Sequence, residues 1–194
     1  RETFVQYKIT SDLHLNHANM IKWYPKYRNF GDKIEDMNRG IIKHWNDNVK
    51  PEDTVYHLGD FAFATEDFIV KILDNLNGKK VFIIGNHDRK VKKVLKEYGS
   101  VYTRLNLRFD INKKQTQIVL DHFPLLEWDG LYHGALHFYG HCHGTLTNKG
   151  RSIDVGYDKQ GKILDLKKAI ELAYLNNQEI FKVETLDFIR QYEG

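Results

Sequence analysis

Cysteine, proline and long apolar runs are all scarce in this sequence. Its 194 residues include three prolines and one cysteine, Cys142, and a single cysteine excludes an internal disulfide framework. The printed sequence does not open with the pattern of a secretory signal, so a reducing, cytoplasmic location is expected. The longest apolar runs, such as 81–84, are far shorter than the roughly 20 residues that cross a bilayer, so a soluble protein without a membrane partner is expected. The net charge of +3 is too small to indicate a polyanionic partner, and nucleic acid is possible but not favoured.

The chain reads as one unit. No segment rich in proline, glycine and serine divides it, and it contains no internal repeat. With 41% apolar and 28% charged residues, the composition is that of an ordinary globular protein. We therefore expect a single domain over residues 1–194, and the sequence leaves its oligomeric state open.

The first hundred residues alternate strand and helix patterns. Strands are expected at 4–10, 54–58 and 80–84, and helices at 34–49, 66–76 and about 91–98. In the first of these helices the apolar residues fall on one face, and Thr65 is a suitable N-cap for the second. This alternation is typical of parallel βαβ units.

The pattern changes after residue 100. Two β-rich runs between Val101 and Leu120 flank Asn112, which predicts an antiparallel hairpin. Strands are expected at 135–139 and 152–155 and a helix at 167–175, while 179–194 is ambiguous between a strand and a short helix. The fold class is therefore α/β, a mixed-sheet β-sandwich flanked by helices.

Polar side chains gather where five of these strands end. They are Asp12 and His14, then Asp60, then Asn86, His87 and Asp88, then His122, and finally His141 and His143. Because side chains alternate across an extended segment, the i, i+2 spacing of Asp12/His14 and His141/His143 aims both members of each pair the same way. Glycines precede Asp60, Asn86 and His141, where they allow a sharp turn and a close approach.

These side chains predict a metal site. Burying Asp12 and Asp60 together without compensation would cost several kcal/mol for each charge, and imidazoles do not neutralise them at pH 7. A divalent cation bound between them would neutralise these carboxylates. The mixture of carboxylate, imidazole and amide suits Mn, Fe, Zn or Mg, and the absence of thiolate ligands argues against a structural zinc site.

The ordered blocks resemble the signature of the calcineurin-like metallophosphoesterases. They are Asp12-Leu13-His14, Gly59-Asp60, Gly85-Asn86-His87-Asp88, His122 and Gly140-His141-Cys142-His143. The blocks span about two thirds of the chain, and their order is far more specific than any one of them. The resemblance implies a four-layer αββα arrangement and a catalytic centre of two divalent metals, with manganese preferred.

The resemblance also implies a role for each residue. Asp12, His14 and His143 would hold one metal, Asn86, His122 and His141 the other, and Asp60 would bridge them. A metal-bound hydroxide would attack phosphorus, His87 would protonate the leaving oxygen, and Asp88 would orient or charge the His87 imidazole.

Nearby residues have competing interpretations. Asn16 and His17 could touch substrate, although Asn16 could equally cap a short helical turn; Arg89 could pair with phosphate or merely open the next helix. Cys142 lies between two expected ligands and is interpreted as buried filler. The aromatic residues 23–30 could stack a nucleobase or pack in the core.

The sequence thus predicts a phosphoester hydrolase acting on a small or nucleotide-like substrate, with a phosphodiester preferred over a phosphomonoester. The Asp60 block continues without the arginine that protein phosphatases of this superfamily carry, which disfavours phosphoproteins. The alternative from another class is a non-catalytic scaffold of the same fold, which predicts degraded ligands.

Overall fold

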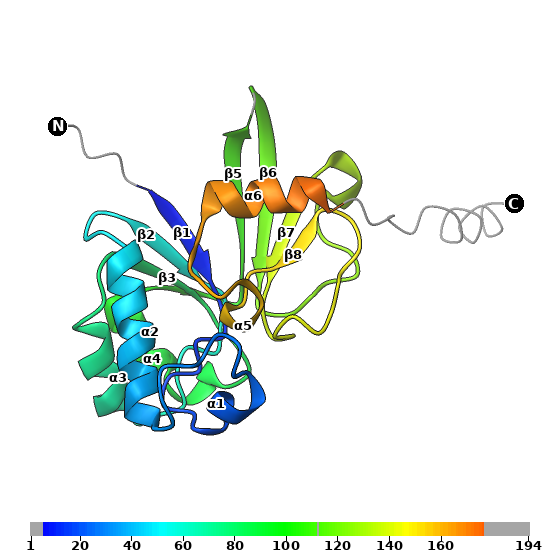
Figure 1. Cartoon of the computed structure of the whole chain (residues 1–194). Helices are drawn as coiled ribbons and strands as arrows, with labels where there is room; N and C mark the ends of the chain where they lie inside the picture. The colour runs from blue at the N-terminus through cyan, green and yellow to red at the C-terminus, as the bar shows by residue number, and fades with distance from the viewer. Residues whose placement is uncertain (1–5, 112, 177–194) are drawn as a thin grey trace, which may run out of the picture.

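The computed structural model describes residues 6–111 and 113–176 and folds them into two sheets flanked by helices (Figure 1). The strands are β1 (Tyr7–Thr10), β2 (Thr54–His57), β3 (Lys79–Ile83), β4 (Gly99–Tyr102), β5 (Arg104–Ile111), β6 (Lys114–Asp121), β7 (Leu136–Tyr139), β8 (Ser152–Asp154) and β9 (Leu164–Asp165). The helices are α1 (Asn19–Trp23), α2 (Ile34–Asn48), α3 (Glu66–Leu73), α4 (Lys92–Tyr98), α5 (Tyr157–Gln160) and α6 (Leu166–Leu175), with 3-10 turns η1 (Asp88–Lys90) and η2 (Leu131–His133). The α/β class and the mixed-sheet sandwich are confirmed.

Each sheet combines parallel and antiparallel pairs. In the first, β1 to β4 run parallel in the order β4-β3-β2-β1, and β9 joins β1 antiparallel at the edge. In the second, β5 and β6 form an antiparallel hairpin, and β7 and β8 continue parallel to β6. Because parallel strands end at the same edge of a sheet, the loops after β1, β2 and β3 are neighbours.

The first sheet is buried on both faces. Side chains alternate across its strands, so that Val55 and Phe82 pack on one face while Tyr56 and Ile83 pack on the other. The first face carries α2, α3 and α4, which gather on one side of the sheet in Figure 1. The second face packs against the apolar side of β6 and β7, which closes the sandwich.

Helix α6 contacts strands of both sheets. It packs against β1 and β9 of the first sheet and β7 and β8 of the second, through Leu166, Ala169 and Ala173. The other face of the second sheet carries a small cluster built around Val119, Trp128 and the η2 turn. Within the described ranges, no helix has the length and apolar character needed to cross a membrane.

The element boundaries follow the sequence closely, with two corrections. Val101 belongs to β4, which pairs with β3 in the first sheet, so the hairpin starts only at Arg104. Thr65 precedes α3, but its side chain makes no capping hydrogen bond. The first strand is described from Tyr7, whereas Asn112 and the ambiguous segment 179–194 lie outside the described residues.

Two buried histidines, His57 and His137, lie in the strands β2 and β7. His57 packs between Phe61 and Phe82, and its Nδ1 accepts the backbone N–H of Gly59 at 3.3 Å. His137 Nε2 accepts the N–H of Leu125 at 3.1 Å, while its Nδ1 lies 3.1 Å from the carbonyl oxygen of Val119 and donates to it. Each bond to a backbone N–H requires a neutral ring, because a protonated nitrogen cannot accept.

These histidines should make the fold sensitive to acid. Burial lowers the pKa of His57 from 6.5 to about 3 and that of His137 from 6.5 to about 4. Below the unfolded value the unfolded chain takes up protons that the folded chain refuses, so the free energy of unfolding falls as pH drops, by up to about 1.4 kcal/mol per pH unit for each histidine. Urea unfolding of metal-free protein from about pH 7.5 to about pH 4.5 measures this slope. His137→Gln should flatten it, exposed His133→Gln should not, and an unchanged slope in His137→Gln contradicts the prediction.

Candidate metal centre

The loops that follow β1, β2, β3, β6 and β7 converge on one site. Their side chains form two groups that could each hold a metal ion, with all ligand atoms of a group within 4.8 Å of one another. The first group is Asp12, His14 and His143, and the second is Asp60, His122 and His141. All six are residues that the sequence analysis selects.

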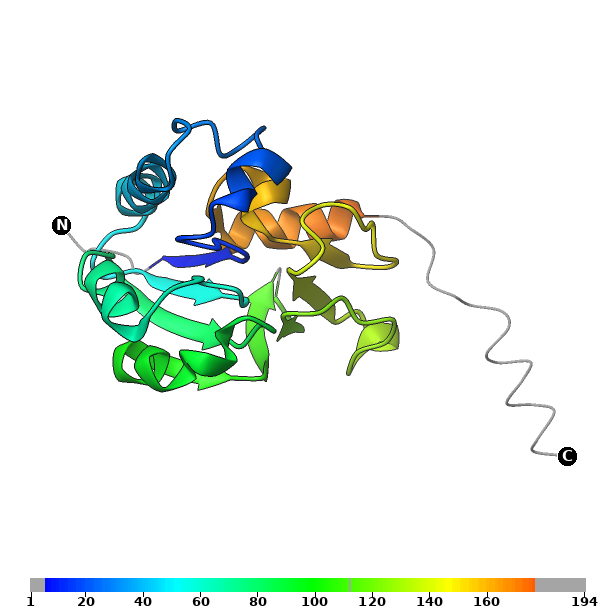
Figure 2. The same cartoon turned by 90° about the horizontal axis from the view of Figure 1, so that it is seen from below.

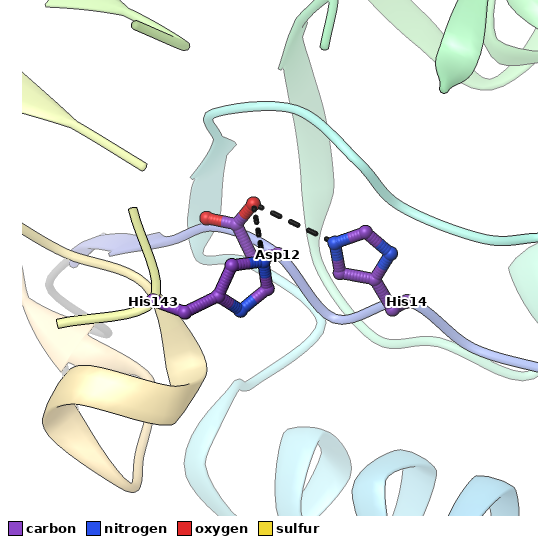
Figure 3. A group of neighbouring side chains, drawn as sticks. All are labelled: Asp12, His14 and His143. Carbon is purple, nitrogen blue, oxygen red and sulfur yellow. Dashed lines mark ion pairs between the residues drawn. The ribbon is translucent and has the colours of Figure 1, made fainter. Parts of the chain in front are cut away.

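The first group joins the loop after β1 to the loop after β7 (Figure 3). Asp12 Oδ1 lies 3.7 Å from His14 Nε2 and 3.8 Å from His143 Nε2, so one carboxylate oxygen faces two imidazoles. These separations are longer than direct hydrogen bonds. They leave space for an atom between the three groups.

The second group adjoins the first through Asp60. Its Oδ2 lies 3.5 Å from Nε2 of His122 and also 3.5 Å from Nε2 of His14, which belongs to the first group. Asn86 Oδ1 is 3.0 Å from His122 Nε2, which brings the amide to this group. Asp60 therefore lies where a bridging ligand would be.

Each carboxylate divides its two oxygens between two tasks. Asp12 Oδ2 accepts the backbone N–H of His141 at 2.9 Å, and Asp60 Oδ1 accepts that of His87 at 3.0 Å. The remaining oxygens, Asp12 Oδ1 and Asp60 Oδ2, face the imidazoles. Each carboxylate thus ties down a loop from elsewhere in the chain while it offers a ligand atom.

The backbone conformation at the ligands differs from the sequence expectation. Asp12, His14, Asp60, His141 and His143 all have positive φ, between +44° and +66°, so neither i, i+2 pair sits on extended chain. Both members of each pair still reach the site because they share the same left-handed bend. Such residues carry roughly 1–3 kcal/mol of strain each, which persists only where surrounding contacts enforce it.

Glycines at these loops are required by close approach. A Cβ at Gly140 would lie 2.0 Å from Ser11 Oγ and 2.3 Å from Asp12 Oδ2, and one at Gly85 would lie 2.1 Å from Asp60 Oδ1. Gly59 has φ +100°, and a Cβ there would meet His122 Nδ1 at 2.4 Å. The expected close approach is present at these glycines, and any side chain would displace a candidate ligand.

The chemistry of the site fits divalent cations. Asp12 Oδ1 and His14 Nε2 are buried and have no hydrogen-bond partner among the described residues. Burial by itself raises the pKa of Asp12, but His14 and the nearby His122 and His143 outweigh it and lower the pKa to about 2. An ionised, buried and unpaired carboxylate oxygen facing imidazole nitrogens is compensated by a cation.

Hydrogen bonds at Nδ1 fix the ring orientation of two of the histidines, His122 and His143. His122 Nδ1 lies 2.7 Å from the Leu58 carbonyl oxygen and donates to it, which leaves Nε2 for the site. His143 Nδ1 lies 2.8 Å from Asp158 Oδ2, which leaves its Nε2 facing Asp12. Hydrogen bonds of this kind set the tautomer of metal-binding histidines.

Asp158 is in turn held by Arg28, and sequence reasoning missed both residues. The Arg28 side chain is fully buried, and its Nε and Nη2 donate to the two carboxylate oxygens of Asp158 at 2.7 and 2.9 Å. Its Nη1 and Nη2 also donate to the carbonyls of Leu13 and Asp12, both at 2.8 Å. Both views place α5, which carries Asp158, near the segment around α1 (Figures 1 and 2). Asp158 follows another strand end, a signal that could have found it, whereas Arg28 follows none.

The expected role of Asp88 is corrected. Its carboxylate accepts the backbone N–H groups of Asp60, Phe61 and Gly85 at 2.7, 3.0 and 2.9 Å, and it forms no ion pair with His87. Burial raises its pKa, and these hydrogen bonds oppose that shift. Asp88 therefore joins the loops after β2 and β3 rather than orienting the His87 imidazole.

A pocket of about 250 Å³ opens over the two groups. It is lined by His14, His17, Met20, Trp23, Tyr24, Asp60, Asn86, His87, His141 and His143. His17 lines this pocket, so it could contact a substrate bound there.

The remaining sequence candidates lie away from the pocket lining. Asn16 donates to the Phe63 carbonyl at 3.3 Å and does not cap α1, which starts after Ala18. Arg89 is exposed on η1 and is not among the lining residues. Cys142 is a half-buried free thiol whose pKa is raised by burial, and it belongs to neither group of ligands.

Two curated proteins illustrate the sequence relationships. No family model matches the chain. An uncharacterised protein of Methanocaldococcus jannaschii is 43% identical over 83 residues, which make up 42% of this chain but only 46% of that protein. The gene 66 protein of Mycobacterium phage L5 is 25% identical over 194 residues, covering 84% of this chain and 92% of the phage protein.

Two solved structures align with the chain, and the first of them shows the same fold. A protein of unknown function from Aquifex aeolicus superposes with a TM-score of 0.62 and 23% identity, covering 87% of this chain and 100% of that one. An archaeal phosphodiesterase aligns with a TM-score of 0.47 and 24% identity, covering 85% of this chain and 96% of that one. The two mixed sheets flanked by helices are thus shared with the Aquifex aeolicus protein, and the ordered motifs at their edge resemble those of the calcineurin-like metallophosphoesterases.

Asp158→Asn should weaken metal binding. The amide keeps the shape of the side chain but loses the charge that orients His143, and changes behind a ligand typically reduce metal affinity about 10- to 100-fold. The buried pair with Arg28 is also broken, which should lower the free energy of unfolding by roughly 3–5 kcal/mol. Calorimetric Mn²⁺ titration, run where circular dichroism shows folded protein, measures the affinity.

The matched control is Asp165→Asn, which removes a partly exposed carboxylate paired with Lys8 away from the site. It should bind Mn²⁺ as the unaltered protein does. If Asp158→Asn is folded and retains full affinity, Asp158 does not position His143.

Proposed function

We propose that this chain is a metal-dependent phosphoester hydrolase with two divalent ions, manganese preferred. The observation that carries the proposal is the pair of adjoining ligand groups in which Asp12 Oδ1 and His14 Nε2 are buried and unpaired. Bound divalent ions would neutralise phosphate charge and activate a water molecule at neutral pH. A cytoplasmic location and a single domain over residues 1–194 remain predictions.

The distances support a specific division of ligands. Asp12, His14 and His143 would hold one ion and Asn86, His122 and His141 the other, with Asp60 shared. His14 and His122 lie at equal distances from Asp60 Oδ2, which supports the shared position. Burial lowers the pKa of His141, followed in effect by His122, and this keeps the ring neutral and able to act as a ligand.

His87 is suited to proton transfer. Its backbone N–H is held by Asp60, while its side chain is 43% exposed and lines the pocket. The backbone of His87 is therefore held in place, while its imidazole is exposed in the pocket, where it can donate a proton to a leaving oxygen. Asp88 contributes by holding the loops together and not by charging the ring.

The pocket favours a substrate of low charge. Among the described residues its lining contains no lysine or arginine, so no such side chain would assist the metal ions in neutralising a second phosphate charge. A phosphodiester carries one negative charge and a phosphomonoester carries close to two near neutral pH. We therefore favour a small phosphodiester as the substrate, with a phosphomonoester as the second candidate.

Model substrates test the function. The Mn²⁺-reconstituted protein should hydrolyse bis(4-nitrophenyl) phosphate with a higher kcat/KM than 4-nitrophenyl phosphate, because no lysine or arginine among the described lining residues would add to the charge of the metal ions. Removal of Mn²⁺ by chelation should abolish both activities, and Asp60→Asn should do so even with metal added. A higher kcat/KM for the monoester supports the second candidate, and activity on neither identifies a non-catalytic scaffold.

His87→Ala should reduce kcat by about 10²- to 10⁴-fold while metal content stays unchanged, because the residue donates a proton but holds no metal. The reduction should be larger for an alkyl leaving group than for 4-nitrophenolate, which departs without a proton. Elemental analysis and steady-state kinetics on the same preparations measure both. Exposed His133→Ala is the control, and equal reductions for both leaving groups would rule out proton donation by His87.

A further inference from the structure

An aromatic wall rises beside the metal ligands. It consists of Trp23, His17 and Phe63, with ring centroids 5.5 Å apart between Trp23 and His17 and 5.0 Å apart between His17 and Phe63. The wall adjoins the candidate centre at two points. Between ring centroids, His17 lies 5.9 Å from His14, and Phe63 lies 6.1 Å from His87. The wall therefore lies beside both a candidate ligand and His87.

The two outer rings are exposed although they are apolar. Trp23 is 60% and Phe63 is 56% exposed, whereas the neighbouring Phe61 is fully buried. Leaving such rings in water forgoes the roughly 25 cal/mol per Å² gained by burying them, and large exposed apolar surface often marks a binding site. Trp23 and His17 line the pocket itself.

The wall is held in place rather than loosely attached. The N–H of Phe63 donates to the Leu15 carbonyl at 2.8 Å, and the Asn16 side chain donates to the Phe63 carbonyl. Trp23 ends α1, whose Met20 is buried. The next residue, Tyr24, stacks on His143 with centroids 4.6 Å apart. A rigid aromatic surface loses little conformational entropy when it binds a flat ring.

We propose that Trp23, His17 and Phe63 form a subsite that stacks a planar aromatic ring carried by the phosphoester, a nucleobase being the favoured occupant. The inference rests on the proposed function for the position of the phosphate, and it adds the class of the group attached to it. Because the wall reaches His87, the proposed proton donor, the stacked group belongs to the departing alcohol. Base stacking on aromatic side chains tolerates different bases, so the subsite would select nucleosides without selecting one base.

Ligand binding to the Mn²⁺-reconstituted protein tests the subsite, with product analysis to verify that the ligands remain intact during the titration. AMP and ribose 5-phosphate share a phosphate and differ in the base, so calorimetry should show AMP binding about 5- to 150-fold more tightly. AMP should also quench tryptophan fluorescence, because Trp23 is the exposed tryptophan while Trp45 and Trp128 are buried. Phenyl phosphate distinguishes the sources of the ring: weaker binding than AMP indicates a nucleobase, and equal binding indicates any aryl group.

Variants locate the effect. Trp23→Ala should bring AMP to the affinity of ribose 5-phosphate and leave ribose 5-phosphate unchanged, while Trp23→Tyr should retain most of the difference. Tyr132→Ala removes an exposed aromatic side chain that does not line the pocket and should change nothing. Equal binding of AMP and ribose 5-phosphate by the unaltered protein overturns the subsite, as does an equal loss for both ligands in Trp23→Ala.

These outcomes are distinguishable from failure of the proposed function. If the protein hydrolyses diesters but binds AMP and ribose 5-phosphate equally, only the subsite is wrong. If it hydrolyses no ester but AMP binds more tightly in a Trp23-dependent way, the subsite stands and the hydrolase proposal falls.

Discussion

The site depends on two buried carboxylates that both hold its loops together and face its imidazoles. Asp12 and Asp60 each use one oxygen to hold the backbone of a loop from another part of the chain and direct the other oxygen at imidazoles. The same side chain therefore assembles the centre and supplies a ligand atom to it. Such an arrangement leaves negative charge in a buried place, and a bound cation would compensate that charge.

The backbone strain at the candidate ligands is maintained by specific contacts around them. Five of the candidate ligands have left-handed backbone, a conformation that their side chains disfavour. The enforcing contacts are specific: Asp88 ties the loops after β2 and β3, and Arg28 ties the loop after β1 to Asp158. Because these contacts come from buried charged groups with complete hydrogen bonding, they hold the ligands in fixed positions before any metal binds.

The success of sequence reasoning depended on how local each signal is. The helix expected at 34–49 is found as Ile34–Asn48, since its apolar stripe repeats over several turns. The strand β9 and the helix α5 are only two and four residues long, and periodicity carries little information at that length. The local pattern predicts Val101 in the hairpin, whereas Val101 pairs with Phe82 of β3 in the first sheet. A local pattern does not record which distant strand a residue will pair with. Asp88 was given a role from its place beside His87, but the η1 turn directs it into the interior.

Short-range patterns of hydrophobicity, and glycines next to polar residues, are enough to predict the α/β class, the strand ends at which chemistry gathers and the residue types that meet there. How the ligands are held depends on contacts between distant segments: the left-handed bends, the Asp88 contacts and the hydrogen bonds between Arg28 and Asp158, which are 130 residues apart. The reason is physical, because such bonds depend on where distant segments come to rest once the sheets and helices have packed, and no periodicity along the chain records that.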